Sequence, residues 1–174
     1  MGEMLAAFCE LPIEGFEIDR SWADPARLAA RAVDWAAALQ VLDDSERAIV
    51  AGKLSRVPEL FRGRTLVLAH GDFSPVNVLS NGSELTGLVD FESVRLADPL
   101  FDVAWWHWSV SFSTRRVLET AWPEFLDGDA VDADEPELLC RVRSLQLLRM
   151  LAGDSLSPGV RDVVAQRLHT TLRR

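Results

Sequence analysis

The segment LAHGDFSPVNVLSNGSELTGLVDFE (residues 68–92) holds most of the strand-forming sequence in this chain of 174 residues. A short apolar run, TLVLA (65–69), leads into the first acidic residue, Asp72. A second apolar run ends at Asp90, and Asn77 lies between the two acids. The fold of this segment decides whether these three polar side chains meet.

A tight hairpin is predicted at the centre of the segment, because Asn-Gly at 81–82 is a strong signal for a two-residue turn between strands. Such a turn pairs Ser80 with Ser83 and, further along the ladder, Asn77 with Thr86. The loop that precedes the hairpin then lies beside the strand end that carries the second acid. We therefore expect the three polar side chains to converge.

Asp72, Asn77 and Asp90 would together form a cluster of hard oxygen ligands. Such a set suits Mg²⁺ bound together with substrate phosphates, whereas zinc prefers His or Cys. A carboxylate that is not bound to the metal could accept a proton from an attacking hydroxyl group. Acids at strand ends are also common turn residues, and only the spacing of the whole set favours a site.

The rest of the chain is predicted to be helical, which gives a mostly helical α+β fold in a single domain over residues 1–174. Asp24 followed by a proline is typical of a helix N-terminus. Apolar residues recur at helical spacing in most of the flanking sequence. The expected helices span residues 23–42, 43–61, 100–112, 114–126, 135–153 and 157–174. The second of these is expected to end near Pro58, and Pro123 is expected to bend or end the fourth.

Composition limits the classes of function. Hydrophobic residues make up 48% and charged residues 26% of the chain, a balance typical of a soluble globular protein. The net charge of -9 disfavours nucleic acid as a partner and favours a cationic small molecule or a metal ion, although it also serves ordinary solubility. We find no membrane-spanning run and no signal peptide. Cys9 and Cys140 lack the spacing of a zinc site and are interpreted as reduced thiols of a cytoplasmic protein.

Three motifs carry a resemblance to a known family: HGDFSPVNVL (70–79), LTGLVDFE (85–92) and ADPLFDVAWW (97–106). Together they resemble the aminoglycoside phosphotransferase and choline kinase-like family, whose catalytic loop has the kinase pattern H-x-D-x-x-x-x-N followed by D-F. The resemblance implies the C-terminal lobe of the protein kinase-like fold, with the hairpin carrying the catalytic and metal residues. It also implies ATP as phosphoryl donor, Mg²⁺, and a small acceptor with a hydroxyl group.

The resemblance also assigns roles by position. It makes Asp72 the catalytic base and has His70 brace the loop. It makes Asn77 and Asp90 the Mg²⁺ ligands, and it makes Asp102 the residue that supports the loop from the following helix. Glu92, Asp127 and Asp129 are the candidate contacts to a cationic acceptor such as an aminoglycoside. For the last two, a solvated acidic loop is the preferred interpretation.

The nucleotide-binding half of a kinase is missing from the pattern. The chain has no G-x-G-x-x-G, and its single lysine, Lys53, lies in a helical pattern and is interpreted as a solvated helix residue. The chain therefore resembles a C-terminal lobe alone: a fragment, a partner of a separately encoded N-terminal lobe, or a binding module without turnover. A lone C-terminal lobe would expose the apolar surface that normally meets the N-terminal lobe, and this exposed face could drive formation of a homodimer. A metal-dependent hydrolase is a weaker alternative, because a two-metal site would need further His ligands.

The aromatic run AWWHWSVSF (104–112) has two interpretations. It could form an aromatic box for a quaternary ammonium group or an amino sugar. It could instead be a buried helix that packs under the catalytic loop. The second is preferred, because a helix that is apolar nearly all round is usually part of a core.

Overall fold

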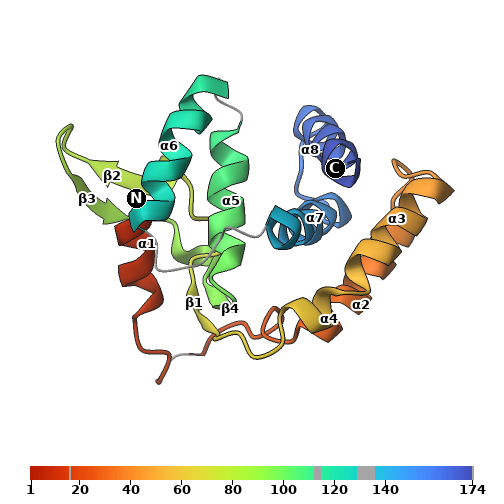
Figure 1. The fold of residues 1–174 in the computed structure, drawn as a ribbon, viewed down its shortest axis with the longest axis horizontal. Coiled ribbons are helices and arrows are strands. Elements are labelled where there is room, and N and C mark those ends of the chain that lie inside the picture. Colours follow the sequence, from red (N-terminus) through yellow and green to blue (C-terminus); the bar gives the residue numbers. More distant parts are fainter. Residues whose placement is uncertain (16, 112–114, 129–135, 174) are drawn as a thin grey trace. The chain divides into compact units, whose positions relative to one another are not determined.

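The computed structural model of the chain describes residues 1–15, 17–111, 115–128 and 136–173. The chain divides into two compact units, each built from two segments far apart in the sequence (Figure 1). The first unit comprises Met1–Ala23 and Thr65–Glu135, and the second comprises Asp24–Arg64 and Pro136–Arg174. A mostly helical α+β fold is confirmed, while a single domain over residues 1–174 stays a prediction.

The first unit contains all four strands of the described residues, in two antiparallel pairs. β1 (Val67–Ala69) pairs with β4 (Arg95–Ala97), and β2 (Val78–Ser80) pairs with β3 (Leu85–Leu88). Two short 3₁₀ turns, Pro75–Asn77 and Phe91–Ser93, lie at the base of the β2–β3 hairpin. The helices of this unit are α1 (Gly2–Cys9), α5 (Leu100–Val110) and α6 (Arg115–Gly128). In Figure 1 the hairpin projects from the unit beside α1 and α6.

The predicted register of the hairpin is wrong. Val78 pairs with Leu88, so that Asn77 faces Val89 rather than Thr86, and a bulge interrupts the ladder between Leu79 and Ser80. The cause is the side chain of Asn81, whose Oδ1 accepts hydrogen bonds from the backbone N–H groups of residues 83 and 84. This Asx-type closure makes a longer turn than the two-residue one.

Helix α5 supplies much of the core of the first unit. Val103, Ala104 and Trp106 are buried, and the ring of Trp106 stacks on Phe125 of α6 with 4.0 Å between ring centroids. Helix α6 continues through Pro123 and ends at Gly128, so the proline does not end it. The expectation of a buried helix is therefore confirmed for the first half of α5 and for Trp106 and Val110. It is not confirmed for the side chains of Trp105, His107, Trp108 and Ser109, which are half-buried.

The second unit is entirely helical over its described residues. Its helices are α2 (Pro25–Ala38), α3 (Asp44–Leu54), α4 (Val57–Leu60), α7 (Pro136–Ala152) and α8 (Pro158–Leu172). The predicted start at Asp24 is confirmed, because its side chain accepts a hydrogen bond from the backbone of Arg27 at 3.0 Å. The helix predicted over 43–61 is two helices. The chain breaks at 55–56, because Pro58 has no N–H to donate to the carbonyl oxygen of Leu54, whereas a proline is tolerated in the first turn of the new helix α4.

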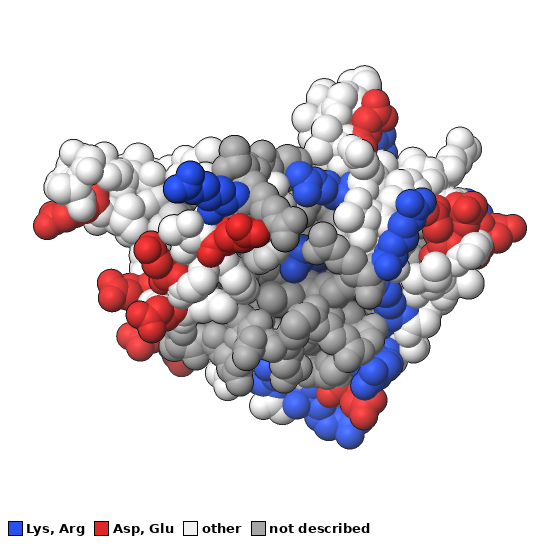
Figure 2. Space-filling view, turned by 45° about the horizontal axis from the view of Figure 1, so that its top comes forward, with Lys and Arg blue, Asp and Glu red and all other residues white. Residues whose placement is uncertain are grey.

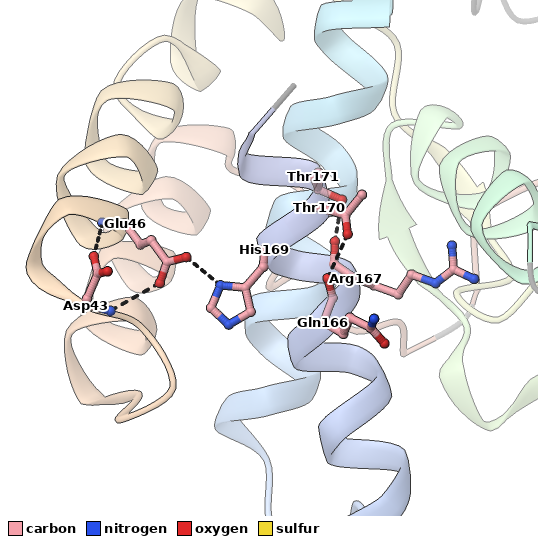
Figure 3. A network of polar contacts seen from close by, with 7 residues as sticks. All are labelled: Asp43, Glu46, Gln166, Arg167, His169, Thr170 and Thr171. Atoms are coloured by element: carbon pink, nitrogen blue, oxygen red, sulfur yellow. Dashed lines mark hydrogen bonds and ion pairs between the residues drawn. The ribbon is translucent and has the colours of Figure 1, made fainter.

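Polar contacts join α3 to α8 within the second unit (Figure 3). Asp43 and Glu46 form a capping box, and the other carboxylate oxygen of Glu46 lies 2.5 Å from Nδ1 of His169. The interpretation of Lys53 as a solvated residue is wrong: it is half-buried, and its Nζ donates to the carbonyl oxygen of Thr171 at 3.1 Å. A cation at the C-terminal end of α8 complements the helix dipole there.

Figure 2 shows one face of the molecule, with acidic side chains in red and basic side chains in blue, and both kinds are present among its coloured residues. None of the helices that the structure describes has the length and apolar character needed to cross a bilayer.

Candidate active site

The His-Gly-Asp sequence begins directly after strand β1, and helix α5 holds its backbone through Asp102. The backbone N–H of His70 donates to Oδ2 of Asp102 at 2.6 Å, and that of Gly71 donates to Oδ1 at 2.8 Å. Asp102 is fully buried. Both carboxylate oxygens therefore fix the direction in which the chain leaves the strand.

Burial makes ionisation of the Asp102 carboxyl unfavourable. Burial raises its pKa above the ordinary value, and the hydrogen bonds from Gly71 and His70 and the positive charge of nearby Arg95 act in the opposite direction. Arg95 is itself buried, donates through Nε to the carbonyl oxygen of Ser93 at 2.8 Å, and lies over the ring of Trp22. The loop is therefore supported by buried polar groups whose partners come from within the same unit.

Gly71 occupies a position that only glycine fits. Its φ is +80°, in the left-handed region, and a Cβ atom there would lie 2.2 Å from the carbonyl oxygen of Ser93. The same atom would lie 2.8 Å from Nε of Arg95. The turn between His70 and Asp72 thus depends on the missing side chain, because backbone atoms cannot move aside as a flexible side chain can.

His70 is buried and spans the site from β1 to the end of β3. Its Nδ1 accepts a hydrogen bond from the backbone N–H of Asp72 at 3.3 Å, and its Nε2 lies 3.0 Å from the carbonyl oxygen of Val89. An Nδ1 that accepts carries no proton, so the tautomer assigned by these contacts is neutral and donates from Nε2 to Val89. The ring also packs edge-on against Phe8, with 5.7 Å between centroids.

Asp72 is half-buried, and both of its carboxylate oxygens carry a hydrogen bond. Oδ2 accepts from Nδ2 of Asn77 at 3.0 Å, and the same Nδ2 donates to the carbonyl oxygen of Asp72 at 2.9 Å. Oδ1 accepts from the indole Nε1 of Trp105. The side chain of Asp72 is thus held between the loop that carries it and helix α5.

Asn77 brings the second acid close through the backbone. The N–H of Val89 donates to the carbonyl oxygen of Asn77 at 2.9 Å, and Asp90 is the next residue. Asp90 has a φ of +67°, the only positive value among the non-glycine residues that the structure describes, and its side chain is exposed. Residues held in this strained region cluster at functional sites, although aspartate adopts it more readily than most residues do.

The oxygen atoms of Asn77 and Asp90 suit a hard cation that also binds water or phosphate oxygens. Nδ2 of Asn77 is used by Asp72, which leaves the amide oxygen available, and Asp90 contributes an exposed carboxylate. The described residues contain no group of three or more His, Cys, Asp or Glu side chains arranged to hold a metal ion. A cation here would therefore depend on water or phosphate oxygens for the rest of its shell, as Mg²⁺ commonly does.

Two of the three residues expected to contact an acceptor are described by the structure. Glu92 lies exposed in the 3₁₀ turn after Asp90, and Asp127 lies exposed near the end of α6. Asp129 falls outside the described residues. No hydrogen bond joins Glu92 or Asp127 to the other site residues among the contacts that the structure describes.

Two residues of the site, Trp105 and Arg95, were not predicted from the sequence. Trp105 was assigned with the buried helix, although it follows Asp102 by three residues and so shares its helix face. That spacing is the signal that would have found it. Arg95 had no comparable signal, because its place beside Gly71 depends on the pairing of β4 with β1.

The comparisons with known proteins bear on this geometry. A model of the phosphotransferase enzyme family matches residues 1–138. The chain belongs to the phosphotransferase enzyme family. No curated protein sequence matches it.

Solved structures of similar fold include an aminoglycoside phosphotransferase from Streptomyces rimosus, with 19% identity, a TM-score of 0.59 and coverage of 83% of this chain and 59% of that one. The same S. rimosus enzyme in complex with ADP and streptomycin matches with 20% identity and a TM-score of 0.57. A macrolide 2'-phosphotransferase of type I matches with 19% identity and a TM-score of 0.59, over 96% of this chain and 56% of that one.

An aminoglycoside 3'-phosphotransferase of type VIII matches with 25% identity and a TM-score of 0.51, over 85% of this chain and 58% of that one. At identities below 25% such likeness establishes the fold alone. The family membership therefore rests on the family model, and the structures add that the fold is similar. The chain spans less than two thirds of the length of each of these structures.

Proposed function

We propose that the chain carries the catalytic loop of an ATP-dependent phosphotransferase, which transfers the γ-phosphoryl group of ATP to a hydroxyl group of a small molecule. The observation that carries this proposal is the hydrogen-bonded pair of Asp72 and Asn77, held beside Asp90 by the hairpin register. In this proposal the chain corresponds to the C-terminal lobe of a protein kinase-like fold, with β2 and β3 carrying the metal residues at their base.

Asp72 is the proposed general base. The acceptor oxygen attacks the γ-phosphorus, a new O–P bond forms, and the bond between the γ-phosphorus and the β–γ bridging oxygen breaks. ADP leaves with the electron pair of that bond, and the proton of the acceptor hydroxyl passes to a carboxylate oxygen of Asp72. Support for ATP as donor comes from the structural relative whose complex contains ADP.

Asn77 and Asp90 are the proposed ligands of Mg²⁺, through the amide oxygen and the carboxylate. When bound, Mg²⁺ neutralises negative charge on the phosphate oxygens. Asp102 and His70 act through the loop: the former holds the backbone at residues 70 and 71, and the latter joins Asp72 to Val89. Positioning of this kind supplies much of the rate in phosphoryl transfer, which asks for little covalent chemistry from the protein.

The proposed acceptor is a small cation with a hydroxyl group, such as an aminoglycoside. The net charge of -9 supports a cationic acceptor, and three of the structural matches cited above are structures of aminoglycoside phosphotransferases. Glu92, Asp127 and Asp129 are the candidate contacts for its ammonium groups. The reaction would take place in the cytoplasm, where ATP is available.

The other contacts to ATP must come from outside the site residues named above, because the sequence contains no glycine-rich phosphate loop and no strand lysine. We propose that an N-terminal lobe supplies them, either on the same polypeptide or on a partner, and that a second copy of the chain is the alternative cover for the exposed face. Without that cover the chain is expected to bind Mg-ATP weakly and to turn over slowly.

A binding module without turnover is the second candidate, and one observation favours it. Both oxygens of Asp72 already accept a hydrogen bond, from Asn77 and from Trp105. To act as the base, Asp72 must accept the hydroxyl proton on an oxygen that already accepts a hydrogen bond. An ionised carboxylate has about four lone-pair sites, so sharing is chemically feasible.

The test is transfer of ³²P from γ-labelled ATP to a panel of aminoglycosides and neutral sugars by the purified protein. Asp72→Asn removes the proposed base, and Asp162→Asn is the matched control, since Asp162 is an exposed acid on α8. We expect labelled acceptor from the wild type and the control, and a loss of roughly 10²-fold or more in Asp72→Asn. Binding of Mg-ATP without any labelled product from the wild type would support the second candidate instead.

A further inference from the structure

Helix α5 contacts the catalytic loop at two successive turns. Asp102 binds the backbone N–H groups of residues 70 and 71, and Trp105, three residues later on the same face, donates its indole N–H to Oδ1 of Asp72. The first contact sets where the loop runs. The second reaches the side chain that the proposed chemistry uses.

Two donors from different elements fix the carboxylate of Asp72. Asn77 donates to Oδ2 from the loop, and Trp105 donates to Oδ1 from α5. One donor alone would leave the carboxylate free to rotate about its terminal bond, which has a broad rotamer distribution. With a donor on each oxygen, the plane of the carboxylate is determined.

Trp105 is itself held by a neighbour and is not a loose surface ring. Its ring stacks on that of Trp108, with 4.6 Å between centroids and 26° between planes. Both rings are half-buried. Stacked aromatic pairs contribute to stability beyond the area they bury, so the indole N–H is presented to Asp72 from a braced ring.

We propose that Trp105 is a positioning residue, which orients the Asp72 carboxylate through its indole N–H and so leaves the acceptor hydroxyl a defined direction of approach. Naming Asp72 as the base rests on the proposed function, whereas the orientation of Asp72 by Trp105 does not. Trp105→Phe removes the N–H and keeps an aromatic ring. Trp108→Phe is the matched control, because it changes the same stacked pair without removing the donor to Asp72.

The direct test is a ¹H–¹⁵N spectrum of the indole and side-chain amide groups in the purified protein. The chain has six tryptophans, and Trp105→Phe assigns the Trp105 indole signal by its loss. We expect that signal to move upfield in Asp72→Ala, since its acceptor is gone. If Asp72→Ala does not fold, Asp72→Asn is the second variant, in which the acceptor is a weaker amide oxygen and a smaller upfield shift is expected.

The side-chain amide of Asn77 reports the orientation of Asp72. In Trp105→Phe we expect it to move towards its position in Asp72→Ala, and in Trp108→Phe we expect it to stay near the wild-type position. Asn81, the other asparagine, is the internal reference. The proposal is overturned if the Trp105 indole signal does not shift in Asp72→Ala. It is also overturned if the Asn77 amide signal has the same position in Trp105→Phe as in the wild type.

A kinetic measurement separates this proposal from the proposed function. If the wild-type protein transfers phosphate, Trp105→Phe should lower kcat by about 10²-fold with little change in KM for the acceptor, as misplacement of a reacting group does. An unchanged kcat would also overturn the proposal. If the wild type transfers no phosphate, the proposed function fails, and the two spectral signals still decide whether Trp105 orients Asp72.

Discussion

Replacing Gly71 by alanine should be far more damaging than the same replacement at Gly82, although both residues have a left-handed backbone. The φ values are +80° and +99°, so an alanine at either position incurs the strain of that region, about 1–2 kcal/mol. At Gly82 a Cβ atom meets nothing within 4 Å. Gly82→Ala therefore measures the backbone strain alone.

At Gly71 the added atom also lies 2.2 Å from the carbonyl oxygen of Ser93, which is backbone and cannot rotate away. The loop must shift, which costs about 1–3 kcal/mol for an overpacked site. The shift also weakens the hydrogen bond from Gly71 to Asp102, and a bond to a charged group contributes about 1.5–3 kcal/mol. Gly71→Ala should therefore lose about 2.5–6 kcal/mol more stability than Gly82→Ala.

Urea unfolding of the wild type and both variants, followed by circular dichroism, gives the two free-energy changes. A difference of this size is a large part of the roughly 5–15 kcal/mol that stabilises a typical domain, so Gly71→Ala should be partly unfolded without urea at elevated temperature. Equal losses in the two variants, within about 1 kcal/mol, would refute the account of Gly71 as a close-packed backbone position.

The remaining predictions concern single polar groups. Asp102→Asn should lose about 1–3 kcal/mol in thermal unfolding at neutral pH, because its NH₂ group would face a backbone N–H of His70 or Gly71; wild-type stability in this variant would contradict it. Burial raises the pKa of Asp102 in the folded chain above its ordinary value of 3.8. Between these two pKa values the folded chain binds a proton that the unfolded chain does not, so the stability from this group falls as the pH rises through that interval. Urea titrations from pH 4 upward should therefore show a flatter pH profile in Asp102→Asn. Asn81→Ala should lose about 1 kcal/mol and speed amide exchange at Val89, since the Asx-type closure sets the hairpin register. Unchanged exchange at that amide would mean that the strands alone set the register.

The sequence spacing predicted the central pair of the site because that pair is local. Asp72 and Asn77 are five residues apart in a short loop, and the hydrogen bond between them needs little knowledge of the rest of the fold. The hairpin also brought Asp90 near, but through a different register from the predicted one. The deciding atom was Oδ1 of Asn81, whose choice of partners a pattern of strands and turns does not specify.

The contacts that could not be predicted join segments far apart in the chain. Trp105 reaches Asp72 across 33 residues, and Lys53 reaches the carbonyl oxygen of Thr171 across 118. Periodicity assigns such side chains to an apolar or a solvated face but does not say which partner that face meets. Arg95 is a further case, since its burial beside Gly71 follows from the pairing of β1 with β4.

The central claim is that Asn77 and Asp90 form one site for the metal-bound phosphates of ATP. Calorimetric titration of Mg-ATP into the purified protein tests it most directly, with Asp162→Ala as the exposed-acid control. We predict binding on the order of millimolar affinity, because the proposed N-terminal lobe would supply the other wall of the cleft. We also predict that Asn77→Ala, Asp90→Ala or added chelator abolishes the heat while the control retains it. Heat that is unchanged in Asn77→Ala and Asp90→Ala, or absent from the wild type at millimolar ATP, would contradict the account.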